Sequence, residues 1–500
     1  MEEERGVSMD EQLNALDATF LELEEADQGA HMHIGGVMVF EPRPDGRPPS
    51  VSEVVARLEQ GLEELPRYRD RLSSPTTGGF SWPFWREDER FRVANHVRAV
   101  SLPPPGGQAE LLEWAGEFYS ERLDRAQPLW EMVVVEGLTG GRWALASKTH
   151  HCMVDGIGSV DTIQLVLDTE PQPAAASHPA SSPSSAPPAP EPPLPLQSLT
   201  AAATGLARLG VRAAKVPVKI ARAGAGLIAG TLGAARHPER AGEALKRSRA
   251  LADVIVQDEL AAAPRTSLNI PIGGKRRLAV AWVPLDELKE IKRSMGGTVN
   301  DVVLAIAAGG LRRLLIERGE SLPEQGLRAM VPVNVRAAGE ELALGNRISS
   351  LFVHLPVAVE DPVERHARQM EEAESLKSGT QALGSSTLLD LTKHAPPVIH
   401  SFLARSLFAT RLFNLTITNV PGPQMTLYGL GSKMTDIWPL VPLAADHAVG
   451  LAVLSYDGRV FFGLNADRDA MPDLDVLAEG IEESFGELRE AALVKSGQSG

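Results

Sequence analysis

The sequence predicts an α/β protein built from two domains of similar size. Short apolar segments that suit strands are followed by segments in which apolar residues recur at helical spacing, and this order repeats along the chain. A stretch rich in proline, alanine and serine, residues 171–197, separates two parts that both show the pattern. With 500 residues and 43% apolar content, the chain is long enough for more than one domain and a large core.

The first part, residues 1–170, is expected to be the N-terminal domain. Its apolar spacing predicts helices near residues 13–23 and 54–65 and strands near residues 33–40, 132–138 and 142–148. His31 and His33 are two residues apart, as metal ligands on one strand face would be, but no acidic or cysteine partner occurs in a compatible pattern. We therefore expect no metal site.

The most reactive group of side chains in this part is His150-His151-Cys152-Met153-Val154-Asp155-Gly156. It follows a predicted strand and precedes apolar residues at helical spacing, which places it on a strand-to-helix turn. A histidine there is suited to take a proton from a hydroxyl or an amine, so the pattern predicts general-base acyl transfer by His151 without a covalent intermediate. Two alternatives remain open: two histidines satisfied by hydrogen bonds in a core turn, and a less favoured nucleophilic Cys152, whose side chain points away from His151 if the strand continues.

Residues 171–197 are predicted to be a linker, because repeated prolines favour extended conformations and few side chains there are apolar enough to be buried. Residues 198–262 are predicted to be a basic helical segment. Between residues 198 and 250, ten basic residues stand against two acidic ones, a balance of +8. Its longest uncharged run, residues 223–235, is shorter than the ~20 residues that span a bilayer. The segment therefore either lies on an anionic lipid surface or joins the domains as a solvated helix.

The last part, residues 263–490, is expected to be the C-terminal domain. Thr298 or Asn300 is expected to cap a helix, with Asp301 favourable at its N-terminus. A hairpin with its turn at Asp457-Gly458 is also expected. Further strands are predicted near residues 278–283, 350–355 and 415–419, and helices near residues 285–294, 362–377 (charged, on the surface) and 474–488.

The overall charge and the cysteine content exclude several classes of protein. The chain has 49 basic and 65 acidic residues, a net charge of −16, which argues against a general nucleic-acid-binding protein. Its single cysteine excludes an internal disulfide framework and fits a reducing cytosol. The first residues are acidic where a secretory signal is basic. We expect a cytoplasmic protein.

The His-His-x-x-x-Asp-Gly pattern resembles the signature of the bacterial wax ester synthase/diacylglycerol acyltransferase family, within the CoA-dependent acyltransferases. Further blocks resemble the family in the same order, from residue 10 to about residue 488. They are Leu16–Leu21, Met32–Gly35, Leu65–Arg69, Pro128-Leu129-Trp130, Ala263–Asn269, Asn300-Asp301 and Asn419-Val420-Pro421-Gly422-Pro423.

The resemblance implies two domains of the chloramphenicol acetyltransferase type, with mixed sheets flanked by helices and an active-site tunnel at the domain interface. It implies that His151 is the base and that His150 and Gly156 shape the turn. Asp155 would hold the loop through an arginine, for which Arg312, Arg336 and Arg347 are alternatives. The remaining blocks contain candidate substrate-site or structural residues: Pro128, Leu129, Trp130, Asn300, Asp301, Asn419, Pro421 and Gly422. Of these, the Pro128–Trp130 block is expected to shape the site without reacting, and Asn419 is expected to present an amide towards the cleft.

The implied reaction moves a long acyl chain from acyl-CoA, a substrate rather than a cofactor, to the hydroxyl of diacylglycerol or of a fatty alcohol. Because CoA is anionic, Lys275, Arg276 and Arg277 are candidates for its phosphates, with a solvated basic turn as the alternative. The apolar acceptor implies that the enzyme associates peripherally with a membrane or lipid droplet. Other interpretations are an acyltransferase whose donor is held by a carrier protein, as in condensation domains, and a catalytically silent lipid-droplet protein.

Overall fold

The computed structural model describes residues 11–73, 82–153, 165–171, 263–334, 348–378 and 412–497. All of them belong to one compact unit formed by Met1–Gln172 and Val256–Gly500. The other unit, Pro173–Ile255, includes most of the linker and most of the basic segment, and it lies outside the described residues.

The first large sheet is mixed and has seven strands in the order β5-β6-β7-β2-β14-β13-β8. Only β5 and β6 are parallel among the neighbouring pairs of this sheet. The strands are β5 (Val97–Ser101), β6 (Trp130–Glu136), β7 (Trp143–His150), β2 (His33–Phe40), β14 (Ser432–Leu440), β13 (Tyr428–Gly429) and β8 (Leu167–Asp168).

The second large sheet has six strands in the order β11-β10-β12-β15-β16-β9. Strand β12 is parallel to both of its neighbours and the remaining pairs are antiparallel, so this sheet is mixed as well. The strands are β11 (Ile348–Leu355), β10 (Leu327–Asn334), β12 (Leu415–Val420), β15 (Val449–Tyr456), β16 (Arg459–Asp467) and β9 (Arg276–Pro284).

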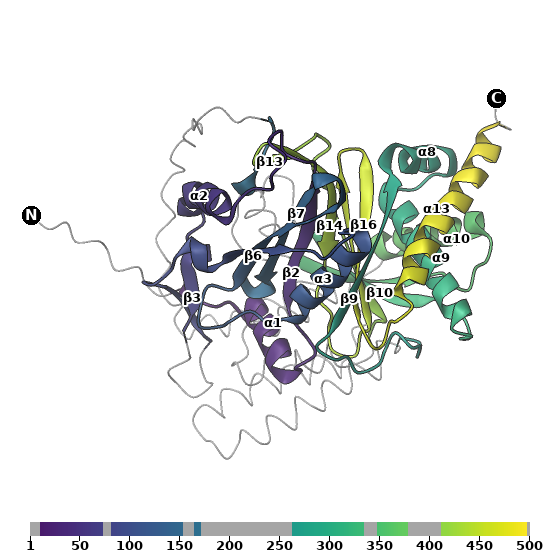
Figure 1. The fold of residues 1–500 in the computed structure, drawn as a ribbon. Coiled ribbons are helices and arrows are strands. Elements are labelled where there is room, and N and C mark those ends of the chain that lie inside the picture. Colours follow the sequence, from purple (N-terminus) through teal and green to yellow (C-terminus); the bar gives the residue numbers. More distant parts are fainter. Residues whose placement is uncertain are drawn as a thin grey trace, which may run out of the picture. The chain divides into compact units, whose positions relative to one another are not determined.

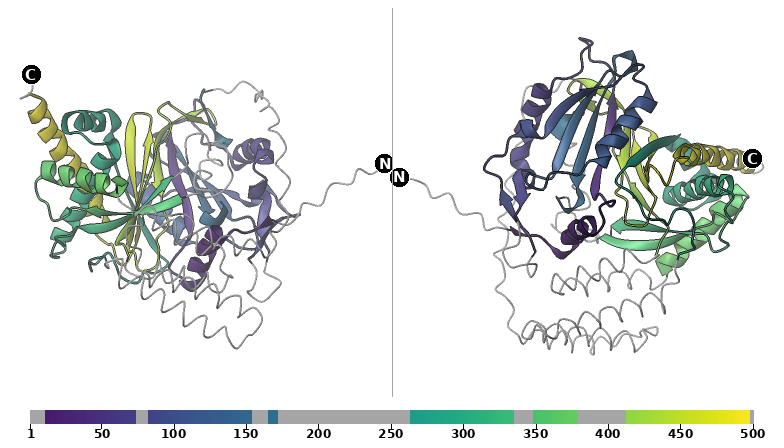
Figure 2. Two further views of the ribbon diagram at one scale, coloured as in Figure 1. Left: turned by 180° about the vertical axis from the view of Figure 1, so that it is seen from behind. Right: turned by 60° about the horizontal axis from the view of Figure 1, so that its bottom comes forward.

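Helices flank both sheets. Helices α8 (Leu285–Met295), α9 (Val299–Glu317), α10 (Pro362–Ser378) and α13 (Leu474–Gly497) gather beside the six-stranded sheet (Figures 1 and 2). Helices α1 (Ala15–Ala26), α2 (Val51–Gly61) and α3 (Gln108–Ser120) accompany the seven-stranded sheet, with a small sheet of β1 (Glu11–Gln12), β4 (Phe84–Glu87) and β3 (Asp70–Leu72). Within the described part of the chain, no helix has the length and apolar content needed to cross a membrane.

Several expected elements are confirmed because their signals are local. Strand β2 covers residues 33–40 as predicted, and β15 and β16 form the predicted hairpin. Asp457 and Gly458 at its turn have φ of 43° and 79°, the left-handed conformation that tight hairpin turns require. Of the two candidate caps of α9, Thr298 is the cap: its side chain accepts from the Asp301 N–H, and the Asp301 carboxylate accepts from the Thr298 N–H.

Strand β14 was not predicted and it connects the two parts of the chain. It comes from the C-terminal part but pairs antiparallel with β2 in the sheet of the N-terminal part. Pro439 within it and a bulge between Met434 and Asp436 conceal the strand pattern. A Cβ atom at Gly463 of β16 would lie 1.7 Å from the Pro439 carbonyl oxygen, so only glycine permits this close approach between the two sheets.

The hydrophobic cores follow the sheets rather than the order of the sequence. One core lies between the six-stranded sheet and its helices. The other core contains β2, β6 and β7 side chains and also Tyr456 and Phe461 from the C-terminal part. The candidate site on β7 is therefore supported by both parts of the chain.

Candidate active site

His151 lies where β7 ends and a single 3-10 turn, His151–Met153, begins. Its backbone N–H donates to the Met32 carbonyl (2.8 Å), and the His150 N–H donates to the Leu129 carbonyl (2.9 Å). The partly exposed imidazole of His151 stacks on the ring of Phe20 in α1, with ring centroids 3.8 Å apart and planes inclined by 20°. The side chain is thus held by its own backbone and by one aromatic face.

The imidazole of His151 is uncharged at neutral pH. Burial, and then the neighbouring His150, lower the pKa of His151 to about 4. Its Nδ1 atom is buried and has no hydrogen-bond partner among the residues that the structure describes. A neutral, fixed imidazole of this kind is able to accept a proton, which is what a general base must do.

His150 has a different role from that of His151. It is 1% exposed, and its Nδ1 accepts a hydrogen bond from the Cys152 N–H (3.2 Å). A neutral ring that accepts at Nδ1 carries its proton on Nε2, and Nε2 lies 3.5 Å from Oε2 of Glu24. His150 therefore holds the 3-10 turn that carries His151.

Glu24 on α1 is a buried carboxylate that lies close to His150 and His33. Its Oε1 lies 3.5 Å from Nε2 of His33, the ladder partner of His150, and its Oε2 lies 2.8 Å from Nη2 of Arg125. Burial acts to raise the pKa of Glu24, but contacts with His150, Arg125 and His33 hold it well below its usual range. Glu24 is thus an anion that faces His33 and His150 from one side.

The sequence interpretation missed Glu24 and Arg125, although a signal for Glu24 was available. Phe20 and Glu24 are four residues apart and so share one face of α1. The same face contacts His151 through Phe20 and His150 through Glu24. No local pattern points to Arg125, which reaches Glu24 across 101 residues of sequence.

Cys152 is buried, and burial raises the pKa of its thiol well above the usual value. The Cys152 side chain was expected to point away from His151 if the strand continued to Cys152. The strand ends at His150, so that condition is not met. The physical argument against a nucleophilic Cys152 is therefore burial rather than strand alternation, because a buried thiol does not ionise readily.

The Pro128-Leu129-Trp130 block supports the histidine turn from the neighbouring strand. Leu129 and Trp130 are 0% and 2% exposed, and Leu129 supplies the carbonyl that binds the His150 N–H. The Trp130 indole donates to the Tyr68 carbonyl (2.8 Å) and stacks on His96. None of these groups is available to react.

The Asn300-Asp301 and Asn419–Pro423 blocks, far apart in sequence, meet in the structure. The Asn419 side-chain amide donates to Oδ1 of Asn300 (2.9 Å), which joins the end of β12 to the start of α9. A Cβ at Gly422 would lie 2.2 Å from the Ser455 carbonyl oxygen, so the glycine allows a close approach of the two backbones. Pro421, beside it, is exposed.

The three consecutive cations proposed for CoA diverge. Arg276 is 1% exposed and donates to the Gly273 carbonyl (2.7 Å) and to the Gly29 carbonyl, which commits it to the fold. Arg277 pairs with Asp475 (2.6 Å). Lys275 lines a pocket.

Asp155 and Gly156 lie outside the described residues, as do Arg336 and Arg347. Arg312, the remaining candidate partner of Asp155, donates to the Val357 and Ala358 carbonyls (3.1 and 3.2 Å). Among the residues that the structure describes, no three histidine, cysteine or acidic side chains are placed to hold a metal ion.

Two mixed sheets flanked by helices, with a histidine pair at the end of a central strand, are the architecture of the chloramphenicol acetyltransferase-like acyltransferases. The chain matches the wax ester synthase/diacylglycerol acyltransferase catalytic domain over residues 13–303 and the C-terminal domain of the same proteins over residues 344–489. It belongs to the wax ester synthase/diacylglycerol acyltransferase family, and the expected family, fold class and enzyme class are confirmed.

Relatives and solved structures agree with this assignment. The chain is 32% identical over 483 residues to the Mycobacterium tuberculosis protein named as a probable diacylglycerol O-acyltransferase, tgs1, with 95% of each chain covered. It is similar in structure to the wax ester synthase/diacylglycerol acyltransferase from Marinobacter aquaeolei VT8, with TM-score 0.63, 26% identity and 96% and 99% coverage. The starter condensation domain of rhizomide synthetase has the same fold, with TM-score 0.53, 14% identity and 97% and 94% coverage.

Proposed function

We propose that this enzyme transfers a long acyl chain from acyl-CoA to the hydroxyl of diacylglycerol or of a long-chain alcohol, with His151 as general base. The observation that carries the proposal is the neutral imidazole of His151 at the end of β7, held by Phe20 and by the Met32 carbonyl. The names of the relatives support both acceptors, since one is called a diacylglycerol acyltransferase and the other also a wax ester synthase.

In the proposed reaction His151 takes the proton of the acceptor hydroxyl while the oxygen attacks the thioester carbonyl. The tetrahedral intermediate then expels the CoA sulfur, which receives the proton back from the imidazolium, so charge and protons balance. The stacked Phe20 ring and the Glu24 carboxylate behind His150 favour the transient positive charge. An apolar tunnel, as implied by the family, would stabilise the acyl chains by about 0.8 kcal/mol for each buried methylene.

The acceptor is tested by offering labelled acyl-CoA with diacylglycerol, with hexadecanol or without an acceptor, and separating the products by thin-layer chromatography. We expect labelled triacylglycerol, wax ester or both, and no ester without an acceptor. Absence of both esters would contradict the proposal. Product formed only from a carrier-protein thioester would favour the condensation-type alternative instead.

The base is tested with His151→Ala. A positioned base contributes about 10² to 10⁴ in rate, so kcat should fall by that factor while the melting temperature stays near that of the wild type. His150→Ala is the matched comparison and should lower kcat less and stability more, because His150 holds the turn from within the core. A His151→Ala enzyme that kept more than about a third of the wild-type kcat would refute the assignment.

We further propose that residues 198–250 of the basic segment bring the enzyme to an anionic membrane or droplet surface. Support comes from its +8 charge in a chain of −16 and from the apolar nature of the proposed acceptor. The wild type should float with anionic liposomes at low salt, and less at high salt. Changing Arg208, Arg212, Lys215, Lys219 and Arg222 to glutamine should reduce flotation; equal flotation of both proteins would assign this segment to joining the domains.

A further inference from the structure

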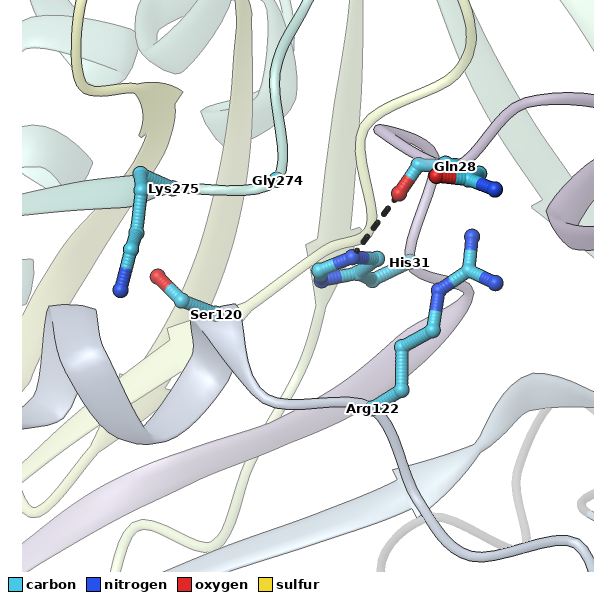
Figure 3. A pocket seen from close by; sticks show the side chains of 6 residues that line it. All are labelled: Gln28, His31, Ser120, Arg122, Gly274 and Lys275. Carbon is cyan, nitrogen blue, oxygen red and sulfur yellow. Dashed lines mark hydrogen bonds between the residues drawn. The ribbon is translucent and has the colours of Figure 1, made fainter.

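A pocket of about 480 Å³ opens where three segments of the chain meet. Gln28 and His31 come from the loop between α1 and β2, Ser120 and Arg122 from the end of α3, and Gly274 and Lys275 from the segment before β9. In Figure 3, His31 lies between Lys275 and Ser120 on one side and Arg122 and Gln28 on the other. No block of the family signature contributes a side chain to this wall.

The charges of the residues that line the pocket favour an anion. None of the six lining residues has an aliphatic or aromatic hydrocarbon side chain, and none is acidic. Arg122 and Lys275 are both exposed cations at its rim. The next residue after Lys275, the buried Arg276, donates to the carbonyls of Gly29 and Gly273.

Arg122 is the cation most available to a ligand. Its Nη2 donates to the carbonyls of Glu24 and Asp27, each at 3.0 Å, and these neutral partners leave its charge uncompensated by a carboxylate among the described residues. Lys275 pairs with Glu117 at 2.9 Å, but its side chain is 61% exposed, and Glu117 also pairs with Arg468. An incoming anion would compete with Glu117 for Lys275. Glu117 would still be paired with Arg468 after Lys275 turned to the anion.

The positive field reaches the ring at the centre of the pocket. Burial, and then the nearby Arg276 and Arg122 guanidinium groups, lower the pKa of His31 to about 4. Its Nε2 lies 3.2 Å from the Gln28 carbonyl and its Nδ1 lies 3.5 Å from the Tyr119 carbonyl. Only Met32 separates His31 from His33, and the Met32 carbonyl binds the His151 N–H, so the wall of the pocket continues into the support of the base.

We propose that this pocket binds a phosphate group of the acyl-CoA donor through Arg122 and Lys275. The proposal rests on the proposed function in that the donor is a CoA thioester. It replaces the run Lys275–Arg277 with two cations from different parts of the chain, since Arg276 is committed to backbone carbonyls and Arg277 to Asp475. Guanidinium and ammonium groups are the usual partners of phosphate oxygens.

The test compares ligands that differ in phosphate. Calorimetric binding of CoA, of dephospho-CoA and of phosphate-free pantetheine is measured with the wild type, Arg122→Gln, Lys275→Gln and the double variant. We expect each single variant to bind CoA about tenfold more weakly and the double variant about a hundredfold, with pantetheine unchanged, because each well-placed cation contact is worth about a factor of ten. Dephospho-CoA, which lacks the 3′-phosphate, shows which phosphate occupies the pocket. If the 3′-phosphate does, the wild type and the double variant should bind dephospho-CoA equally well. If the diphosphate does, the double variant should bind dephospho-CoA more weakly than the wild type.

Two controls keep the result interpretable. Arg122→Lys retains the charge and should bind CoA nearly as the wild type does. Lys289→Gln removes an exposed cation of α8, which pairs with Asp286, and should have no effect.

The proposal is overturned if the double variant binds CoA as tightly as the wild type, or if CoA and pantetheine weaken equally. It is also overturned if the variant keeps CoA affinity but loses binding to phosphatidic acid vesicles, because the pocket would then serve a lipid headgroup. CoA binding is measured without an acceptor. A wild type that binds CoA but makes no ester would therefore contradict the proposed acceptors and leave the phosphate pocket standing. A wild type that binds no CoA refutes the proposed donor itself.

Discussion

Desolvation of His151 determines the pH range in which it acts as a base. An ordinary histidine is half protonated near pH 6.5, whereas burial and His150 lower the pKa of His151 to about 4. A lowered pKa means that the ring stays neutral, and therefore competent, down to mildly acidic pH. The cost is a weaker base, which the proposed reaction offsets by placing anionic and aromatic groups near the imidazolium.

We therefore expect kcat/KM to be nearly constant between about pH 8 and about pH 5 and to fall below that range, because kcat/KM reports the free enzyme. The measurement is the initial rate at low donor concentration across this range at constant ionic strength. Circular dichroism at each pH is the control for acid unfolding. A fall centred near pH 6.5 in folded protein would show that His151 is solvated like an exposed histidine.

Among the elements, α1 does more than cover the sheet. It places Phe20 against His151, and it places Glu24 against His150 and His33. Strands β2 and β7 place His33 and His150 opposite each other. The turn that carries the base thus depends on a helix more than a hundred residues earlier in the chain.

Glu24→Gln should lower both kcat and stability. The amide removes the charge that faces Arg125 and His150, at a cost of about 1–3 kcal/mol for unsatisfied buried partners. We expect kcat to fall about tenfold with little change in KM for either substrate. Glu25→Gln is the matched control: it also pairs with Arg125 but its side chain is 65% exposed, so it should behave as the wild type. Identical behaviour of the two variants would mean that Glu24 does not position His150.

In the whole molecule, β14 ties the C-terminal part to the sheet that carries the site. Its pairing with β2, and the packing of Tyr456 and Phe461 in the same core, make each part incomplete without the other. An isolated N-terminal part would expose the edge of β2 and lose part of its core.

A protease site inserted within residues 171–197 tests this dependence. After cleavage the two pieces should stay together through gel filtration and keep most of the activity of the uncut protein, which is the control. The piece formed by residues 1–172, expressed alone, should show no cooperative thermal unfolding. Separation of the cleaved pieces into two folded proteins would show that β14 contributes little to the N-terminal sheet.

The sequence by itself determined the features that depend on neighbouring residues. Strand β2, the Asp457-Gly458 hairpin and a helix cap at Thr298 or Asn300 follow from periodicity and backbone preference over a few residues, and the structure selects Thr298 as the cap. The histidine pair and the family blocks identified the enzyme class, because a motif is a local pattern as well.

Only the tertiary structure decided which distant groups meet. It brought Glu24 to His150, Asn419 to Asn300 and β14 to β2, and it buried Arg276 while leaving Lys275 and Arg122 at one pocket. Spacing along the chain reports which side chains share a face, but not which faces come together. That pairing depends on burying apolar surface and satisfying polar groups over the whole fold, so it is settled by contacts between residues a hundred or more positions apart.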